Sequence, residues 1–250
     1  MNRPWIACCC LVLLACSTTS PSTPGPTAAA VVAQPDRHPK DVARDATRKP
    51  VDTLNFFGTT PGMRVGEIGA GGGYTTELVA RVVGPTGQVY AQNVEAWGGP
   101  GMDTIWNARL AQPVNKPVVR LTRPWEDPFP PEANNLDAVY SVMVYHDAVA
   151  EKADPVKMNR AVFAALKSGG RYVVIDNSAV AGSGPEVADA LHRIDEGMVR
   201  QQVEAAGFKV DASGDFLRNA SDTRTWAVDP PPQGPQAHTQ DRFALRFVKP

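Results

Sequence analysis

Apolar and polar positions along most of the chain follow two alternating patterns, one typical of buried strands and one typical of helices. Buried strands are predicted at residues 64–68, 88–92, 118–121, 136–144 and 171–176. After the first of these, Leu78, Val79, Val82 and Val83 share one face of a helix that ends at Gly84. Further helices are predicted at residues 159–166 and about 195–206. Because strands separated by helices join through right-handed crossovers, the pattern predicts an α/β fold with a doubly wound, mostly parallel sheet.

The last predicted strand has a different pattern from the others. Phe243, Leu245 and Phe247 alternate with other residues, as in a strand with one exposed face. Strands of this kind are common in antiparallel pairs. We therefore expect residues 243–247 to form an antiparallel strand at the edge of the sheet.

The N-terminus has the features of an export signal. Arg3 is followed by an uncharged, largely apolar run from Trp5 to Ala15, which is too short to span a bilayer but suits a secretory signal peptide. The run ends in Leu-Leu-Ala-Cys16, which resembles the lipobox of bacterial lipoproteins. That resemblance implies cleavage before Cys16 and a lipid anchor on this residue. The alternative is an ordinary signal peptide with incidental cysteines.

The next segment is predicted to be a tether. Residues 17–35 carry no charge and are rich in Ser, Thr, Pro and Ala, a composition that cannot bury enough apolar surface to fold. The chain is therefore divided into a signal peptide (1–15), a disordered tether (16–38) and one folded domain (39–250). This organisation predicts an exported protein in the periplasm or cell envelope, held at the membrane by Cys16.

The net charge of the chain and the positions of its cysteines exclude several kinds of binding and catalytic site. The 250 residues have a net charge of −1, which lacks the basic excess of an extended nucleic-acid interface, so no nucleic-acid partner is expected. All four cysteines (Cys8, Cys9, Cys10 and Cys16) lie near the N-terminus. The folded domain therefore has no thiol nucleophile, no disulfide framework and no cysteine zinc site.

A glycine-rich segment follows the first strand. Glu67–Gly73 has the pattern acidic-x-Gly-x-Gly-x-Gly at the carboxyl end of that strand, where open α/β sheets bind ligands. Its glycines allow the backbone to approach a ligand closely. The dinucleotide-binding pattern fails, because Tyr74 or Thr76 stands where it requires a small residue, and no Gly-Lys-Ser/Thr follows as in a phosphate-binding loop. A nicotinamide oxidoreductase is thus disfavoured, and a purely structural turn is the other alternative.

This pattern resembles the first motif of class I S-adenosylmethionine (SAM)-dependent methyltransferases. Further segments, from Arg48 to Pro50 and on to Asp241–Phe247, are similar to a bacterial family of predicted methyltransferases over most of residues 40–250. The resemblance implies a seven-stranded Rossmann-like methyltransferase fold with an antiparallel last strand, and SAM as cofactor. The cofactor-binding residues that it implies are Glu67, Gly69, Ala70, Gly71, Gly73, Tyr74, Gln92, Asn93 and Trp125.

Within that resemblance, Glu67 would hold the methionyl amino end of SAM. Asn93 stands where these enzymes usually place an acidic residue for the ribose hydroxyls, with Gln92 before it and Glu95 just beyond. An amide binds hydroxyls less strongly than a carboxylate does. Trp125 follows the third strand, where the adenine is usually bound, and either stacks on the base or packs in the core.

The methyl acceptor is expected beside Tyr145, His146 and Asp147, which follow the fourth strand. A methyltransferase positions its acceptor for in-line attack and removes a proton where the nucleophile requires it. His146 titrates in a useful range, with Tyr145 or Asp147 to orient it; the alternative is that His146 and Asp147 cap the next helix. The pair His192-Arg193 either lines the acceptor pocket or binds an anionic substrate; the alternative is that both residues belong to a solvated helix start.

No metal ligand is assigned, but one metal-dependent alternative stays open. Asp147, Asp176 and Asn177 resemble the magnesium ligands of catechol-type O-methyltransferases. The leading hypothesis is methyl transfer from SAM to a small-molecule or envelope acceptor. The alternative from another class is a non-catalytic envelope lipoprotein that kept the fold.

Overall fold

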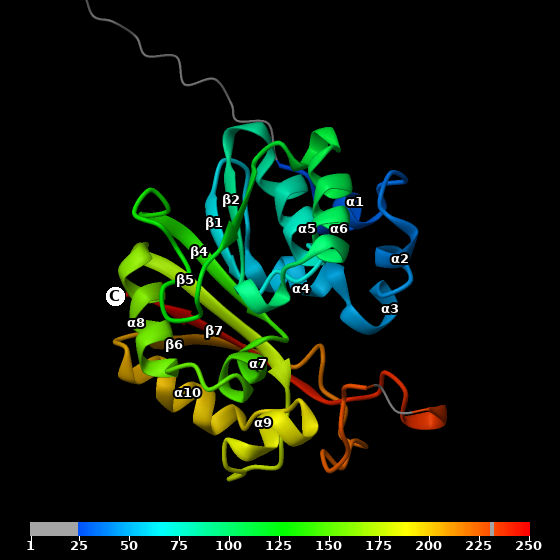
Figure 1. Ribbon diagram of the computed structural model, residues 1–250, viewed down its shortest axis with the longest axis vertical. Coiled ribbons are helices and arrows are strands. Elements are labelled where there is room, and N and C mark those ends of the chain that lie inside the picture. The colour runs from blue at the N-terminus through cyan, green and yellow to red at the C-terminus, as the bar shows by residue number, and fades with distance from the viewer. Residues whose placement is uncertain (1–24, 231–232) are drawn as a thin grey trace, which may run out of the picture.

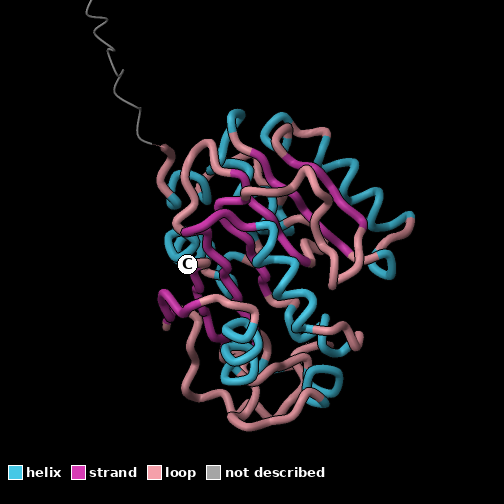
Figure 2. The backbone as a smooth tube through the Cα atoms, turned by 90° about the vertical axis from the view of Figure 1, so that its left-hand side faces the viewer, coloured by secondary structure: helices cyan, strands magenta, loops and turns pink. Residues whose placement is uncertain are grey.

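The computed structural model describes residues 25–230 and 233–250, which form a seven-stranded sheet covered by helices on both faces (Figures 1 and 2). The strand order is β3-β2-β1-β4-β5-β7-β6, and all strand pairs are parallel except those made by β7. This confirms the predicted doubly wound, mostly parallel α/β sheet. The strands are β1 (Arg64–Ile68), β2 (Gln88–Asn93), β3 (Val118–Thr122), β4 (Leu136–Val142), β5 (Leu166–Asn177), β6 (Lys209–Gly214) and β7 (Arg242–Val248).

The last strand is antiparallel as predicted, but its predicted place at the sheet edge is wrong. β7 lies between β5 and β6, and the edge is formed by β6, which was not predicted. Phe243, Leu245 and Phe247 are fully buried on one face of β7, and Ala244 is fully buried on the other. The alternation in sequence therefore reflects large apolar residues on one buried face of β7, and the buried Ala244 with the partly exposed Arg246 on the other.

The helices form two layers that bury opposite faces of the sheet (Figure 1). The helices are α1 (Ala28–Val32), α2 (Pro39–Val42), α3 (Asp45–Arg48), α4 (Pro50–Phe57), α5 (Tyr74–Val83), α6 (Pro100–Leu110), α7 (Tyr145–Ala150), α8 (Pro155–Ala165), α9 (Glu186–Leu191) and α10 (Glu196–Ala205). In β4, Val139 packs with α8 and α10 on one face, whereas Ala138 and Tyr140 pack with α1, α4 and α5 on the other.

The folded domain begins before residue 39, where it was predicted to start. The last part of the predicted tether, up to residue 38, therefore belongs to the domain. Val31 of α1 is only 2% exposed and packs in the same apolar cluster as α4 and α5. Arg37 donates two hydrogen bonds to Asp45 and is 5% exposed. Because one apolar residue and one paired charge anchor it, the segment from Thr27 to His38 belongs to the domain.

The export signal and the anchoring residue Cys16 lie outside the described residues. Across residues 25–230 and 233–250, every helix is too short or too polar to cross a bilayer. Membrane association through Cys16 thus stays a prediction from the sequence.

Candidate active site

A tight glycine turn at the carboxyl end of β1 forms the base of the candidate site. Gly69, Gly71 and Gly73 have φ angles of 61°, 54° and 81°, a left-handed region that disfavours other residues. A Cβ at Gly69 would lie 2.9 Å from Val144, so that glycine is required for packing against the end of β4. A Cβ at Gly71 would meet no atom within 4 Å. The turn therefore presents bare backbone to open space at Gly71.

Gly71 also lines a pocket of about 110 Å³ between the turn and the segment after β4. Its lining includes the carboxylate residue Glu67, the arginines Arg44 and Arg48, and residues 142–144. Among the residues predicted to bind the cofactor, this pocket is lined by Glu67, Gly69, Ala70, Gly71 and Tyr74. It thus places one carboxylate and two guanidinium groups around a small space.

Glu67 is held in an environment that disfavours its charge. Its side chain accepts a hydrogen bond from the Thr76 hydroxyl, and the residue is 4% exposed. Burial raises the pKa of Glu67 to about 7, against the opposing effects of Thr76, Arg109 and Arg48. A cationic ligand beside Glu67 would favour the ionised carboxylate.

Arg44 and Arg48 are site residues that the sequence reasoning did not assign. Both guanidinium groups lie over the Tyr74 ring, at 5.3 and 4.9 Å from its centre. Burial, together with the nearby charges of Arg44 and Arg242, lowers the pKa of Arg48 to about 9. Arg48 belongs to the Arg48–Pro50 segment, which is similar to the methyltransferase family. That similarity was the sequence signal that could have identified Arg48 as a site residue. Its position suits an anionic group of a ligand.

Gln92 and Asn93 support the turn instead of lining the pocket. The Gln92 side chain accepts the Gly69 N–H at 3.0 Å and donates to the Arg123 carbonyl. Asn93 accepts the Gly71 N–H at 2.8 Å and donates to the Gly71 carbonyl at 2.9 Å. Gly73 starts helix α5. Both amides are thus committed to backbone groups, those of the turn and, for the Gln92 N–H, the Arg123 carbonyl after β3.

A second, more open pocket of about 370 Å³ lies beyond the ends of β2 and β3. It is lined by Glu95 and by Trp125, whose indole N–H donates to Glu151 at 2.8 Å. Trp97 donates to the same carboxylate at 2.8 Å and meets Trp125 edge to face. Trp125 is 4% exposed, so it packs in the core and also borders the pocket.

The three residues predicted after β4 point in different directions. Tyr145 is fully buried, and its hydroxyl lies 2.9 Å from Gln202 and 2.8 Å from Asn159, so it is a core residue. His146 Nδ1 lies 2.7 Å from Asp176, and His146 Nε2 lies 3.3 Å from Asp147. The structure therefore brings His146 and Asp147 together but separates Tyr145 from them.

The two carboxylates beside His146 do not suit the predicted role of general base. Burial disfavours the imidazolium ion, but Asp176 and Asp147 outweigh burial and raise the pKa of His146 to about 10. A general base works best with a pKa near the operating pH. Two flanking carboxylates instead favour positive charge at this ring.

The magnesium alternative does not fit the arrangement. Both oxygens of Asp176 accept hydrogen bonds from His146, and Asp176 is fully buried behind that ring. Asn177 accepts from Arg242 at 3.2 Å and donates to the His192 carbonyl. Asp176 and Asn177 therefore do not converge with Asp147 on a shared cation.

His192 and Arg193 are neighbours in sequence, but their side chains have different partners. His192 Nδ1 lies 3.6 Å from Asp147, so it joins the cluster after β4. Arg193 is fully buried and paired with Asp222. Arg193 is therefore a structural residue and not a solvated helix start.

In overall fold the chain is similar to several solved methyltransferase structures. A SAM-dependent methyltransferase from Aquifex aeolicus matches with a TM-score of 0.60 at 20% identity, over 83% of this chain and 93% of that chain. An O-methyltransferase from Thermotoga maritima matches with a TM-score of 0.51 at 15% identity, over 85% and 66%. The [4+2]-cyclase SpnF matches with a TM-score of 0.56 at 18% identity, over 84% and 80%. No family model and no curated protein matches the chain. These likenesses establish the fold.

Proposed function

We propose that this protein is a SAM-dependent methyltransferase. The observation that carries the proposal is a pocket lined by Glu67, Arg48 and Gly71, together with the absence of any protein atom within 4 Å of a Cβ placed at Gly71. SAM carries an ammonium, a sulfonium and a carboxylate. A carboxylate beside the cationic groups and a guanidinium beside the carboxylate complement this charge pattern.

The remaining contacts follow from the two pockets. Glu67 would bind the ammonium and Arg48 the carboxylate of the methionyl part. The adenosine part would extend toward the pocket lined by Glu95 and Trp125. Since Asn93 is committed to Gly71, Glu95 is the better candidate for the ribose hydroxyls. The methyl acceptor would enter beside His146 and Asp147, close after Val144, which lines the cofactor pocket.

The affinity for SAM is expected to rise about tenfold between pH 6 and pH 8. The pKa of Glu67 is raised to about 7, so the carboxyl is mostly neutral at pH 6 and mostly ionised at pH 8. Only the ionised form attracts the ammonium, so binding weakens as pH falls through 7. Calorimetry with SAM and its demethylated product, at a series of pH values, measures the effect.

Glu67→Gln is expected to weaken binding at pH 8 by about 10- to 100-fold and to flatten this part of the pH profile. The amide oxygen still accepts from Thr76, which limits the effect on folding. Glu204→Gln, on the exposed surface of α10, is the matched control and should bind like the wild type. If neither SAM nor its product binds at any pH, the proposed function is wrong.

A second candidate is a SAM-fold protein that does not transfer methyl groups. Two observations favour it: Asn93 offers no free group to a ribose, and the cyclase SpnF shares the fold. Methyl-labelled SAM incubated with the protein and cell-envelope extract discriminates the two. Transfer of label to any small molecule or envelope component supports the methyltransferase, whereas binding without transfer supports the second candidate.

We also propose export and lipid anchoring at Cys16, on the sequence pattern alone. Labelled palmitate is expected to enter the full-length protein in a bacterial host, because cleavage would leave Cys16 as the modified N-terminal residue. Cys16→Ala should lose the label, whereas Cys10→Ala, inside the signal peptide, should keep it. Label retained in Cys16→Ala would contradict the anchor.

A further inference from the structure

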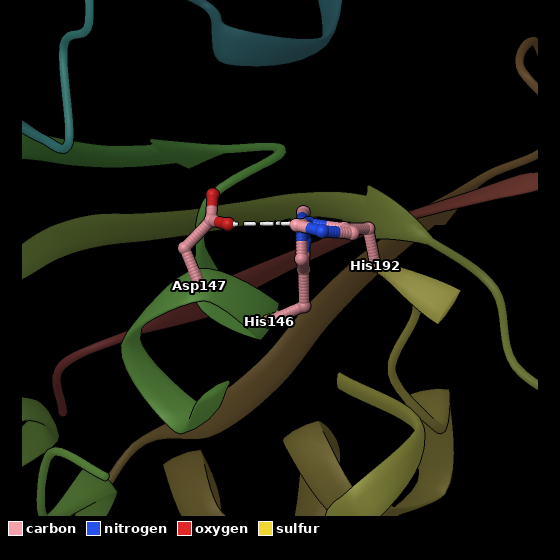
Figure 3. Close-up of side chains that lie close together, drawn as sticks. All are labelled: His146, Asp147 and His192. Carbon is pink, nitrogen blue, oxygen red and sulfur yellow. Dashed lines mark ion pairs between the residues drawn. The ribbon is translucent and has the colours of Figure 1, made fainter. Parts of the chain in front are cut away.

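We propose that His146, Asp147 and His192 bind one divalent transition-metal ion at the carboxyl end of β4. His146 and Asp147 stand in the first turn of α7, and His192 directly follows α9. Figure 3 shows the Asp147 carboxylate facing the two imidazole rings. The site differs from the magnesium alternative, because Asp176 and Asn177 are not ligands in it.

Two distances within the cluster, both from Asp147, are close to those between ligands around one ion. Asp147 Oδ1 lies 3.3 Å from His146 Nε2 and 3.6 Å from His192 Nδ1. Both are longer than good N–H···O hydrogen bonds, which measure about 2.7–3.2 Å. Ligand atoms bonded at about 2.0–2.1 Å to a tetrahedral ion are about 3.3–3.5 Å apart. The three ligand atoms lie within 4.8 Å of one another, so a small closure of the rings completes the set.

The His146 ring is already fixed in the orientation that ligation requires. Asp176 is fully buried and lies 2.7 Å from Nδ1, and it also accepts the backbone N–H of His146 at 2.9 Å. Histidines that bind a metal usually donate their other ring N–H to a carboxylate or carbonyl in this way, which fixes the ring orientation. Here the other nitrogen, Nε2, faces Asp147.

His192 is likewise held in place by the backbone. It adopts a left-handed conformation, with φ 51° and ψ 48°, which is uncommon for a residue with a side chain. The Asn177 amide at the end of β5 donates to the His192 carbonyl at 3.1 Å. Residues of α7, of the end of β5 and of the end of α9 therefore meet at one point, and only a small closure of the rings around an ion is needed.

The ligand set indicates which kind of ion binds. Two imidazoles and one carboxylate suit Zn²⁺, Fe²⁺ or Co²⁺, whereas Mg²⁺ prefers oxygen ligands alone. The side chains of Asp147 and His192 are 23% and 31% exposed, so an external ligand can reach the ion. Three protein ligands with an open position are typical of catalytic metal sites. An oxygen of the methyl acceptor would fill that position; this role rests on the proposed function, but ion binding does not.

The experiment titrates Zn²⁺ and Co²⁺ into the full chain after treatment with a chelator, without SAM. Cys8, Cys9, Cys10 and Cys16 are changed to serine so that no thiol competes for the metal. We expect one ion per chain and a visible Co²⁺ absorption band, with no binding of Mg²⁺ at the same concentrations. His192→Gln should weaken binding by more than the 10- to 100-fold typical of losing an outer-shell partner.

Two further variants make the result decisive. Asp147→Asn removes a ligand from a partly exposed position and should also weaken binding, which covers the case in which His192→Gln fails to fold. His238→Gln, in an exposed loop, is the matched control and should bind the metal like the parent. Absence of a one-to-one complex, or unchanged binding in Asp147→Asn, overturns the proposal.

A parallel SAM titration of the same chelator-treated protein separates the two proposals. SAM binding without metal binding overturns the metal site alone, because the cofactor pocket does not include the cluster. Metal binding without SAM binding overturns the proposed function and leaves the metal site standing.

Discussion

Gly71→Ala is expected to weaken SAM binding by about 10- to 100-fold while the chain still folds. A Cβ at Gly71 meets no protein atom within 4 Å, so the protein itself has room for it. The new methyl group would instead occupy space in the pocket that the proposed function assigns to the cofactor. The positive φ of 54° should cost about 1–2 kcal/mol of stability. Calorimetry gives the affinity, and urea unfolding gives the stability.

Gly84→Ala is the matched control for that experiment. Gly84 also has a positive φ of 65° and open space around it, but it ends α5 at the opposite end of the helix from the pocket. Its ψ of −168° is almost confined to glycine, so alanine should cost at least as much stability there. Gly84→Ala should nevertheless bind SAM like the wild type. Equal affinities in the two variants would show that Gly71 does not face the cofactor.

The sequence predicted the first half of the sheet well, because the signals there are local. β1, the glycine turn and α5 are contiguous, and each has its own pattern of apolar residues or glycines. β6 was missed because residues 209–214 are largely polar or small, with no strong apolar period. The predicted position of β7 at the sheet edge was wrong, because the order of strands depends on which surfaces of the sheet remain to be covered after the other elements have packed.

The candidate site also combines residues that a local sequence motif predicts with residues whose roles depend on tertiary packing. Glu67 and the glycines were assigned from one contiguous motif, and the structure places Glu67, Gly69 and Gly71 around one pocket. The structural roles of Gln92 and Asn93 depend on how closely β2 approaches the turn, which no local pattern encodes. The cluster of His146, Asp147 and His192 joins α7 to the end of α9, so neighbouring residues in sequence did not reveal it.

Asp222→Ala is expected to destabilise the fold by about 3–5 kcal/mol. The side chains of Asp222 and Arg193 are both fully buried, and two hydrogen bonds of 2.9 and 3.3 Å join them. Removing the carboxylate leaves a buried guanidinium without its hydrogen-bonded counter-charge, which is more costly than losing the pair together. Urea unfolding followed by circular dichroism measures the change. Asp211→Ala breaks the partly exposed pair with Arg246 and should cost less than about 1 kcal/mol.

Asp222→Asn separates the two roles of this carboxylate. Asp222 also accepts the backbone N–H groups of Arg224 at 2.8 Å and Asp241 at 2.6 Å, and an amide oxygen can still accept from one of them. If the charge opposite Arg193 dominates, the asparagine variant should lose nearly as much stability as the alanine variant. If the backbone hydrogen bonds dominate, most of the stability should return. An alanine variant no less stable than Asp211→Ala would contradict a buried pair here, because solvent would then be compensating Arg193.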